Sequence, residues 1–576
     1  MTSPLATLDR VSMRFGNAGP KAISEISAEI LDGRVTGLVG ADGAGKTTLL
    51  RLIAGLLAPS EGALTVCGFN TVRDATKIKR EVAYMPQRFG LYEDLAVIEN
   101  LTLYADLRGV PGDERPETFD RLLQFTDLKR FTGRLAGALS GGMKQKLGLA
   151  CALIRKPRLL LLDEPSVGVD PISRRELWKM VYELVDQGIG VIWSTAYLDE
   201  AERCRAVLAL SEGKLLFDGA PSLLTSSAEG RTVLVQGIER DKRIVLTRAL
   251  DRPEFVDGVI QGASVRLLLA ENAAIPPVET LQAGPKARIE ATAPRFEDAF
   301  MARLGARSRG RSALADARNK ATSSDELMVE ADQLTKTFGD FVAADRISFS
   351  IRRGEVYGLI GPNGAGKSTT FKMLCGLLQP SSGAARVAGV DLAASPGRAR
   401  SRLGYMAQKF SLYGDLSVAQ NLKFFGGVYG LDRRALADVS ARMAETLNLT
   451  AYLDHTAARL PLGYKQRLAL ACSLLHDPDV LFLDEPTSGV DPRARREFWT
   501  HINALASRGV TILVTTHFLE EAEYCDRVAL IYRGRAIAGG TPDELKAKGG
   551  IAGAPALSLE DAFINLVHEF DQERAA

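Results

Sequence analysis

The chain has 576 residues, of which 46% are hydrophobic and 25% are charged, both ordinary values for folded globular protein. Its 72 Lys and Arg nearly balance its 70 Asp and Glu, and a net charge of +2 gives no support for bulk nucleic-acid binding. No apolar run approaches the ~18 residues that a membrane-spanning helix needs.

Two copies of one sequence unit follow each other along the chain, so internal repetition is its main organising feature. The Gly-rich motif at Gly40–Thr47 recurs at Gly361–Ser368, an offset of 321 residues. The same offset relates Asp163 to Asp484. We therefore expect two copies of one domain.

A second motif, Glu-Asp-Ala-Phe, breaks this register. Its copies at 297–300 and 560–563 are 263 residues apart instead of 321, so the first copy carries 58 extra residues. Short β-rich runs in this insertion predict a small αβ module. The expected divisions are a first repeated domain at 1–225, an αβ accessory module at 226–302, a flexible linker at 303–325, a second repeated domain at 326–545 and a tail at 546–576.

The segment between the copies is rich in arginine and small residues. Residues 303–318 contain five Arg and one Asp, a composition typical of a solvated linker. A patch for acidic lipid or RNA is the alternative interpretation. No aromatic residues interleave these charges, as single-strand binding would require, so we favour the linker and expect no nucleic-acid partner.

Each Gly-rich motif lies between a predicted strand and a predicted helix. In that position the glycines let backbone N–H groups wrap a phosphate, and the helix N-terminus adds affinity for the anion. The motif predicts that Lys46 and Lys367 reach the β- and γ-phosphates. Thr47 and Ser368 are then the expected Mg²⁺ ligands.

Two carboxylates end an apolar, strand-like run in each copy. The pairs are Asp163 with Glu164 and Asp484 with Glu485. Beside a phosphate loop, such an Asp holds the Mg²⁺ shell and such a Glu polarises the attacking water. The sequence therefore predicts hydrolytic chemistry on a bound phosphate.

The run Leu139–Gln145 (LSGGMKQ) lies between the first phosphate loop and the Asp-Glu pair, and it resembles the signature motif of ATP-binding-cassette (ABC) ATPases. Gln87 and Gln408 stand at the family's Q-loop position, and Val514–His517 resembles its switch-histidine segment. The resemblance implies an α/β fold with two P-loop ABC nucleotide-binding domains in tandem, each with a helical subdomain. It also implies ATP and Mg²⁺ as ligands.

The resemblance assigns site residues, with an aromatic side chain at positions 15 and 338 stacking on adenine, where Tyr is more usual in the family. The expected nucleotide-binding residues are Phe15, Gly40, Gly43, Gly45, Lys46, Thr47, Thr48, Ser140, Gly141, Gly142, Phe338, Gly361, Asn363, Gly364, Gly366, Lys367, Ser368 and Thr369. The expected Mg²⁺ ligands are Thr47, Gln87, Asp163, Ser368, Gln408 and Asp484. The expected catalytic residues are Glu485, His517 and Gln408.

The two copies differ in two of these motifs. The family stacks its cassettes head to tail, so each ATP lies between one phosphate loop and the other signature. In the second signature Pro461 and Leu462 replace the Ser and the first Gly, and in the first copy Ala196 replaces the switch histidine. All five His lie beyond residue 450. Both departures fall in the site built on Lys46, so we expect it mainly to retain ATP, although Glu164 leaves slow hydrolysis possible.

The tails at 296–300 and 559–563 resemble those of bacterial export ATPases of the ABC-2 type. This resemblance implies an ATPase that powers efflux of drugs or other small molecules through two permease subunits on separate chains. We then expect a cytoplasmic protein, peripheral on the cytoplasmic face of the inner membrane, whose two cassettes dimerise within the chain. The alternatives are a soluble tandem cassette protein of the ribosome and the tandem ATPase of a sugar importer.

The helical insertions at 88–138 and 409–459 have equal length and are the expected docking surface for the permeases. Within them the apolar and aromatic stretches Phe89–Tyr92 and Phe410–Tyr413 are candidate contacts. Packing inside the helical subdomain explains these stretches equally well.

Overall fold

The computed structural model of the chain describes residues 4–16, 19–87, 90–305, 310–316, 325–408, 411–550 and 557–575. They form two compact units. The first is Met1–Glu229 with Pro294–Gly305 and Gly489–Pro492, and the second is Gly230–Ala293 with Ala306–Ser488 and Arg493–Ala576. The insertion of the first repeat is therefore part of the unit that contains the second repeat.

The first cassette contains two sheets that share one apolar core with helix α1 (Lys46–Ile53). A six-stranded sheet has the order β10-β9-β3-β8-β7-β6 and consists of β3 (Val35–Gly40), β6 (Val82–Met85), β7 (Leu159–Asp163), β8 (Gly190–Thr195), β9 (Ala206–Ser211) and β10 (Lys214–Gly219). An antiparallel sheet has the order β2-β1-β4-β5 and consists of β1 (Pro4–Arg14), β2 (Lys21–Leu31), β4 (Glu61–Val66) and β5 (Phe69–Asn70). Every residue of β7 and β8 is buried, as in a parallel sheet covered on both faces.

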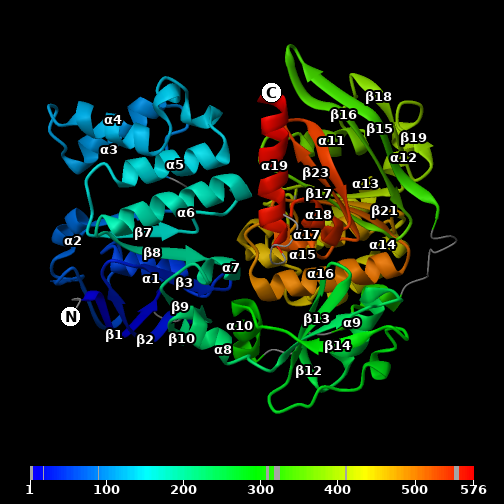
Figure 1. Cartoon of the computed structure of the whole chain (residues 1–576), viewed down its shortest axis with the longest axis horizontal. Coiled ribbons are helices and arrows are strands. Elements are labelled where there is room, and N and C mark those ends of the chain that lie inside the picture. Colours follow the sequence, from blue (N-terminus) through cyan, green and yellow to red (C-terminus); the bar gives the residue numbers. More distant parts are fainter. Residues whose placement is uncertain are drawn as a thin grey trace. The chain divides into compact units, whose positions relative to one another are not determined.

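Helices surround these sheets, and two of them form a helical arm (Figure 1). The helices are α2 (Ala75–Glu81), α3 (Val97–Arg108), α4 (Arg115–Phe125), η1 (Lys129–Phe131), η2 (Ala136–Ala138), α5 (Gly141–Ala152), α6 (Pro171–Asp186), α7 (Leu198–Ala201) and α8 (Pro221–Ser226). The helical arm consists of α3 and α4. Helix α5 packs on α3 and carries the first signature at its N-terminus.

The second cassette repeats this architecture. Its six-stranded sheet has the order β20-β21-β22-β17-β23-β24 and consists of β17 (Val356–Ile360), β20 (Leu403–Met406), β21 (Val480–Asp484), β22 (Thr511–Thr516), β23 (Arg527–Tyr532) and β24 (Arg535–Gly540). Its antiparallel sheet has the order β16-β15-β18-β19 and consists of β15 (Leu327–Phe338), β16 (Phe341–Arg352), β18 (Ser382–Val387) and β19 (Val390–Asp391). Its helices are α11 (Lys367–Leu374), α12 (Pro396–Arg400), α13 (Val418–Val428), α14 (Arg433–Thr446), η5 (Thr450–Tyr452), η6 (Ala457–Arg459), α15 (Leu462–Leu474), α16 (Pro492–Ser507), α17 (Leu519–Ala522), α18 (Pro542–Lys548) and α19 (Leu559–Ala575). The α/β architecture expected for the repeats is confirmed.

The insertion is a small αβ module built on four antiparallel strands. Their order is β12-β13-β11-β14, and the elements are β11 (Thr232–Gln236), α9 (Lys242–Asp251), β12 (Phe255–Gln261), β13 (Ser264–Leu269), η3 (Val278–Leu281) and β14 (Arg288–Ala291). Helix α9 packs on β12 and β13, and in Figure 1 the module lies next to α16 of its own unit. After the module, α10 (Phe296–Leu304) packs on α8 of the first cassette.

Part of the expected linker packs against the second cassette. Residues 310–316 include the short helix η4 (Ala313–Asp316), and Ser312 and Leu314 are only 5% and 4% exposed. This part of the segment is therefore not fully solvated as its composition predicted, because Ser312 and Leu314 are buried while Arg311, Ala313 and Ala315 are exposed. The remaining arginine-rich positions of 306–309 and 317–324 lie outside the described residues.

Within the described residues, no helix combines the length and apolar character needed to cross a bilayer. The six cysteines are buried and free. Four of them, Cys151, Cys472, Cys204 and Cys525, are the repeated pairs of the two cassettes, and each is a small core residue.

Candidate functional site

The phosphate loops connect β3 to α1 and β17 to α11. Two equivalent glycines have left-handed φ in both loops, at +77° and +100° for Gly43 and Gly45 and at +77° and +105° for Gly364 and Gly366, and in the second loop Gly361 also has a positive φ of +153°. A Cβ on Gly366 would lie 2.4 Å from a backbone oxygen, whereas a Cβ on Gly43 or Gly364 would meet nothing within 4 Å. The loops therefore require glycine and leave an open cradle beside the backbone, which fits a phosphate.

The loop lysines curl back over their own loops. Lys46 Nζ donates to Gly40 O at 2.9 Å, and Lys367 Nζ donates to Gly361 O at 2.6 Å. Both side chains are buried, being 4% and 5% exposed. Each cation is thus held at the cradle before any phosphate arrives.

The expected metal ligands lie at the carboxyl ends of the central strands. Thr47 Oγ1 donates to Asp163 Oδ1 at 3.1 Å, and burial raises the pKa of this aspartate. In the second cassette Asp484 accepts a hydrogen bond from Thr515, while Ser368 is exposed at the loop. Hydroxyl and carboxylate oxygens are ligands that Mg²⁺ prefers, so both donor sets fit this ion.

The two glutamates that follow β7 and β21 share an unusual backbone conformation. Glu164 has φ +51° and Glu485 has φ +47°, a left-handed region that is uncommon for residues other than glycine. Both are buried, at 6% and 7% exposure. Each also accepts a hydrogen bond from its Q-loop glutamine, at 2.5 Å from Gln87 and 2.7 Å from Gln408.

Their other partners differ. Glu164 Oε1 lies 3.1 Å from Lys46 Nζ, so the first glutamate pairs with the loop lysine. Glu485 Oε2 lies 3.3 Å from His517 Nδ1. Burial opposes ionisation of Glu485, but His517, Lys367 and Gln408 outweigh it and lower its pKa to about 2. The second site therefore holds an ionised carboxylate beside an imidazole.

The switch position completes this difference. His517 is buried, and among the described residues its Nε2 has no hydrogen-bond partner, which leaves one nitrogen for a ligand. Ala196, at the same place after β8, is 1% exposed and offers only a methyl group. Three residues earlier, the ring of Trp193 stacks on that of Trp178 with centroids 4.1 Å apart.

The signatures begin α5 and α15. Ser140 is the N-cap of α5, and its Oγ accepts a hydrogen bond from Met143 N at 3.3 Å. Pro461 is the N-cap of α15 and makes no side-chain cap. A Cβ on Gly142 would lie 2.7 Å from Ser173 Cβ, so the packing of α5 on α6 requires this glycine. Gly141 is partly buried at the same helix end.

The remaining expected nucleotide contacts lie around the two cradles. Phe15 and Phe338 follow or end the first strand of each cassette and are 55% and 52% exposed, which leaves their rings available for stacking. Thr48 and Thr369, in the first turn of α1 and α11, and Asn363 of the second loop are partly exposed.

One pair of buried carboxylates was missed by the sequence reasoning. Glu200 in α7 accepts hydrogen bonds from Thr195 at 2.6 Å and from Ser166 at 2.9 Å, and burial raises its pKa. Glu521 in α17 likewise accepts hydrogen bonds from Thr516 and Thr487. These glutamates join the switch segment to the turn after the Asp-Glu pair. The 321-residue repeat relates Glu200 to Glu521 and could have revealed them.

Comparisons with known proteins agree with this geometry. Residues 23–167 and 344–488 each match the family model described as ABC transporter. The chain is 55% identical, over the full length of both proteins, to the probable multidrug ABC transporter ATP-binding protein YbhF of Escherichia coli. It is 43% identical over 218 residues to the Nod factor export ATP-binding protein I of Burkholderia lata, which covers 38% of this chain and 72% of that protein.

A solved structure resembles both repeats together. It is the complex of the archaeal ribosomal stalk protein aP1 with the archaeal ribosome recycling factor aABCE1. The TM-score is 0.57 and the identity 19%, over 93% of this chain and 90% of that one. At this identity the likeness shows the tandem fold alone.

Proposed function

Because the chain belongs to the family of ABC transporter ATP-binding proteins and is an ATPase of that family, we propose that it powers export of drugs or other small molecules. The names of its relatives support export: one is a probable multidrug transporter subunit and another a Nod factor exporter subunit. The permease lies on separate chains in this proposal, with two subunits matching the two helical arms.

We propose further that the two ATP sites are unequal, and the single observation that carries this is the environment of the two glutamates. Glu485 is ionised beside His517 and Gln408, an arrangement suited to orienting a water molecule. Glu164 pairs with Lys46, and in its cassette Ala196 takes the place of the histidine. The second cassette is therefore the proposed site of hydrolysis.

In the proposed reaction Lys367 and the N–H groups of the second loop bind the phosphates. His517 Nε2 faces the terminal phosphate and keeps Glu485 in position. Bound Mg²⁺ supplies charge neutralisation on the phosphates, and Ser368, Gln408 and the shell around Asp484 would hold it. In the first cassette Thr47, Gln87 and Asp163 would hold the corresponding ion.

The proposed pairing of the cassettes follows the family's head-to-tail arrangement. The second loop then faces Ser140, Gly141 and Gly142, while the first loop faces Pro461 and Leu462. Proline has no N–H to donate, and a leucine side chain occupies space that a phosphate needs. Each charge-assisted hydrogen bond lost is worth roughly 1.5–3 kcal/mol, which adds to the loss of the histidine in the same site.

The test compares Glu485→Gln with Glu164→Gln in steady-state ATP hydrolysis. A general base contributes about 10²–10⁴-fold to a rate, so Glu485→Gln should lower kcat by at least two orders of magnitude. Glu164→Gln should lower it less than two-fold. Binding of a fluorescent ATP analogue controls for an intact fold. Equal losses in the two variants would falsify the asymmetric assignment.

The transport part of the proposal predicts docking of permeases on the helical arms. Exposed apolar side chains lie in both helical insertions: Tyr92, Leu107 and Leu135 within residues 88–138, and Tyr413, Phe424 and Val428 within residues 409–459. Phe89 and Phe410, expected to take part, lie outside the described residues. Docking there would place the protein on the cytoplasmic face of the inner membrane.

Purification of the tagged chain from detergent-solubilised cells tests this part. Multi-span membrane proteins should co-purify with it in stoichiometric amounts. Recovery with ribosomes and without integral membrane proteins would contradict the transport assignment and favour a role in translation.

A further inference from the structure

The segment that follows α17 in the second cassette contacts the accessory module Gly230–Ala293 through Glu523, Cys525 and Asp526. Asp526 pairs with two cations at the start of α9: Arg243 Nη2 donates to its Oδ2, and Lys242 Nζ lies 3.3 Å from its Oδ1. Arg243 is only 8% exposed, so this ion pair is largely shielded from solvent. Lys242 Nζ also donates to Cys525 O at 3.4 Å.

Two further contacts flank this pair. Arg496 Nε in α16 lies 3.3 Å from Asp257 Oδ2 in β12, and the two side chains are 8% and 4% exposed. At the turn between β12 and β13, Ala263 N donates to Asp543 Oδ2 at 2.9 Å. The module therefore binds the second cassette through polar and charged groups.

The charge of Asp526 is matched to its partners. Burial disfavours the ionised form, but the attraction of Arg243 and Lys242 outweighs burial and lowers the pKa of this carboxyl group. Removing one member of such a pair leaves an uncompensated charge in a shielded place. The contact is therefore selective for opposite charge at this position.

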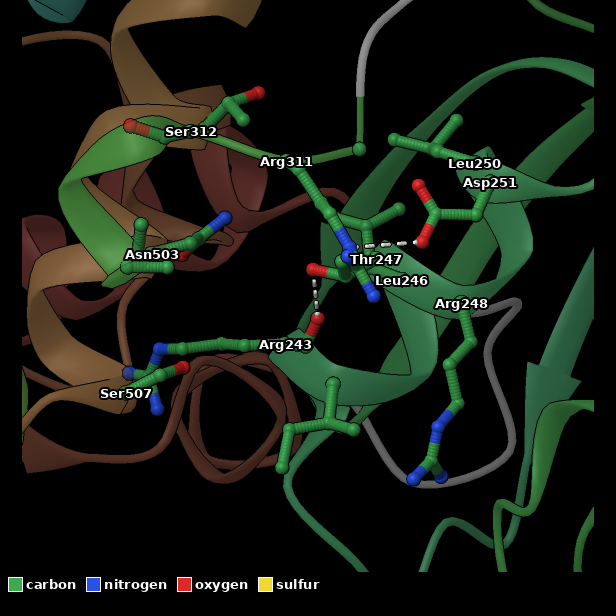
Figure 2. A pocket seen from close by; sticks show the side chains of 15 residues that line it. Arg243, Leu246, Thr247, Arg248, Leu250, Asp251, Arg311, Ser312, Asn503 and Ser507 are labelled. Carbon is green, nitrogen blue, oxygen red and sulfur yellow. Dashed lines mark hydrogen bonds and ion pairs between the residues drawn. The ribbon is translucent and has the colours of Figure 1, made fainter.

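Residues 310–316 extend this contact between the module and the second cassette. Ser312 Oγ lies 2.8 Å from His501 Nδ1 in α16, and Arg508 Nη1 donates to Leu314 O at 3.2 Å. Figure 2 shows Arg311 reaching Asp251 of α9, with Nε 3.1 Å from Oδ2. This segment, α9 and α16 surround a pocket of about 430 Å³. The contact thus joins α9, residues 310–316 and α16, which are far apart in the sequence.

The corresponding residues of the first cassette could not make this contact. The 321-residue offset places Arg205 where the second cassette has Asp526, and Arg205 is exposed. It also places Met180 at the position of His501 and Ser222 at that of Asp543. An arginine at this place would repel Arg243 and Lys242. Asp526, Asp543 and His501 thus have different residues at their places in the first copy, whereas Arg175 matches Arg496.

We infer that the module recognises the second cassette, and not the cassette into which it is inserted, by the charge at Asp526, and that its docking holds the second ATP site in its working geometry. Asp526 Oδ2 accepts a hydrogen bond from Val356 N at 2.9 Å, and β17 leads from Val356 to the second phosphate loop. Residues 523–526 also follow the short helix that begins just after His517. The second half of the inference rests on the proposed hydrolysis at that site, whereas the recognition does not.

The test reverses the charge on the module side with Arg243→Glu and neutralises it on the cassette side with Asp526→Asn. The asparagine keeps an oxygen that can accept from Val356 N, so it removes the charge and leaves that hydrogen bond. Arg205→Ala is the matched control in the first cassette. Amide hydrogen exchange over α9 reports docking, and steady-state hydrolysis, separated into kcat and KM for ATP, reports the site.

Both Arg243→Glu and Asp526→Asn should speed exchange over α9 at least ten-fold and lower kcat about ten-fold with less than two-fold change in KM. Arg205→Ala should change neither reading. Unchanged exchange over α9 would overturn recognition by charge. Faster exchange with unchanged kcat would overturn the coupling to the ATP site, and it is distinguishable from failure of the proposed function because Glu485→Gln tests that independently.

Discussion

The two cassettes have nearly the same backbone and different chemistry at the same place. In both, a buried strand ends in Asp-Glu and the glutamate adopts a left-handed conformation beside a Q-loop glutamine. In the first cassette the glutamate neutralises Lys46, and in the second it lies beside His517. A shared fold therefore fixes where the carboxylate stands, while the residue after β8 or β22, Ala196 or His517, decides whether an imidazole lies beside it.

The difference extends to the residue that anchors the Asp-Glu turn. In the second cassette Thr515 Oγ1 donates to Asp484 and accepts from Glu485 N. In the first cassette Ser194 holds this position, and its Oγ has no partner among the described residues. Side-chain hydrogen bonds of Thr515 thus tie the Asp-Glu turn to β22 in the second cassette, and in the described part of the first Ser194 makes no such bonds.

The strongest way to break this comparison is to exchange the switch residues. His517→Ala removes the imidazole that faces Glu485, and we expect kcat to fall at least 100-fold, within the usual range for loss of a group that positions a base. Ala196→His adds an imidazole to the first site but leaves Pro461 and Leu462 in the signature that faces it in the proposed pairing, so it should change kcat less than two-fold. Steady-state hydrolysis of ATP measures both.

Thermal unfolding and binding of a fluorescent ATP analogue control for damage to the fold in these two variants. A ten-fold or larger gain from Ala196→His would mean that the missing histidine alone limits the first site. The two ATP sites would then differ only in the switch residue, and the second signature would not contribute to the asymmetry.

A second experiment repairs the second signature, which faces the first phosphate loop in the proposed pairing. In a Glu485→Gln background the remaining hydrolysis should come from the first site, through Glu164. Pro461→Ser with Leu462→Gly restores a hydroxyl and opens space for phosphate, which predicts about a ten-fold rise in that residual rate. The reverse change, Ser140→Pro with Gly141→Leu in the natural chain, should lower kcat at least ten-fold.

An unchanged residual rate after repair would show that the two cassettes do not pair signature to loop as the family does. The repaired chain must first be shown to bind the ATP analogue at two equivalents per chain. That measurement separates failure of pairing from failure of the first phosphate loop.

Much of each site could be predicted from sequence because its chemistry depends on short, local motifs. In each loop the glycines and the lysine, Lys46 or Lys367, lie within one run of eight residues, and this spacing alone indicates a phosphate cradle. Comparison of the repeats then located Ala196 and Pro461 as departures. The pairing of Lys46 with Glu164 was not predicted, since it depends on how the lysine side chain curls over its own loop.

The docking of the accessory module was also beyond the sequence. Its composition indicated a small αβ domain, and its position in the chain suggested that it belonged to the first repeat. The module packs on the second cassette through contacts between residues far apart in the sequence, such as Arg243 with Asp526, which are 283 positions apart. The burial of Ser312 and Leu314 was also not predicted, since it depends on packing against the distant helix α16.

The smallest expected effect comes from one glycine in each signature helix. A Cβ on Gly142 would lie 2.7 Å from Ser173 Cβ, whereas on Gly463 it would lie 3.5 Å from Ala494 Cβ, an ordinary contact. Alanine stabilises a helix over glycine by up to about 1 kcal/mol, and overpacking costs about 1–3 kcal/mol. Gly463→Ala should therefore raise the unfolding temperature by a few degrees and Gly142→Ala should lower it. Calorimetry of the full chain measures both, and shifts of the same sign would mean that α5 and α15 pack alike despite their different signatures.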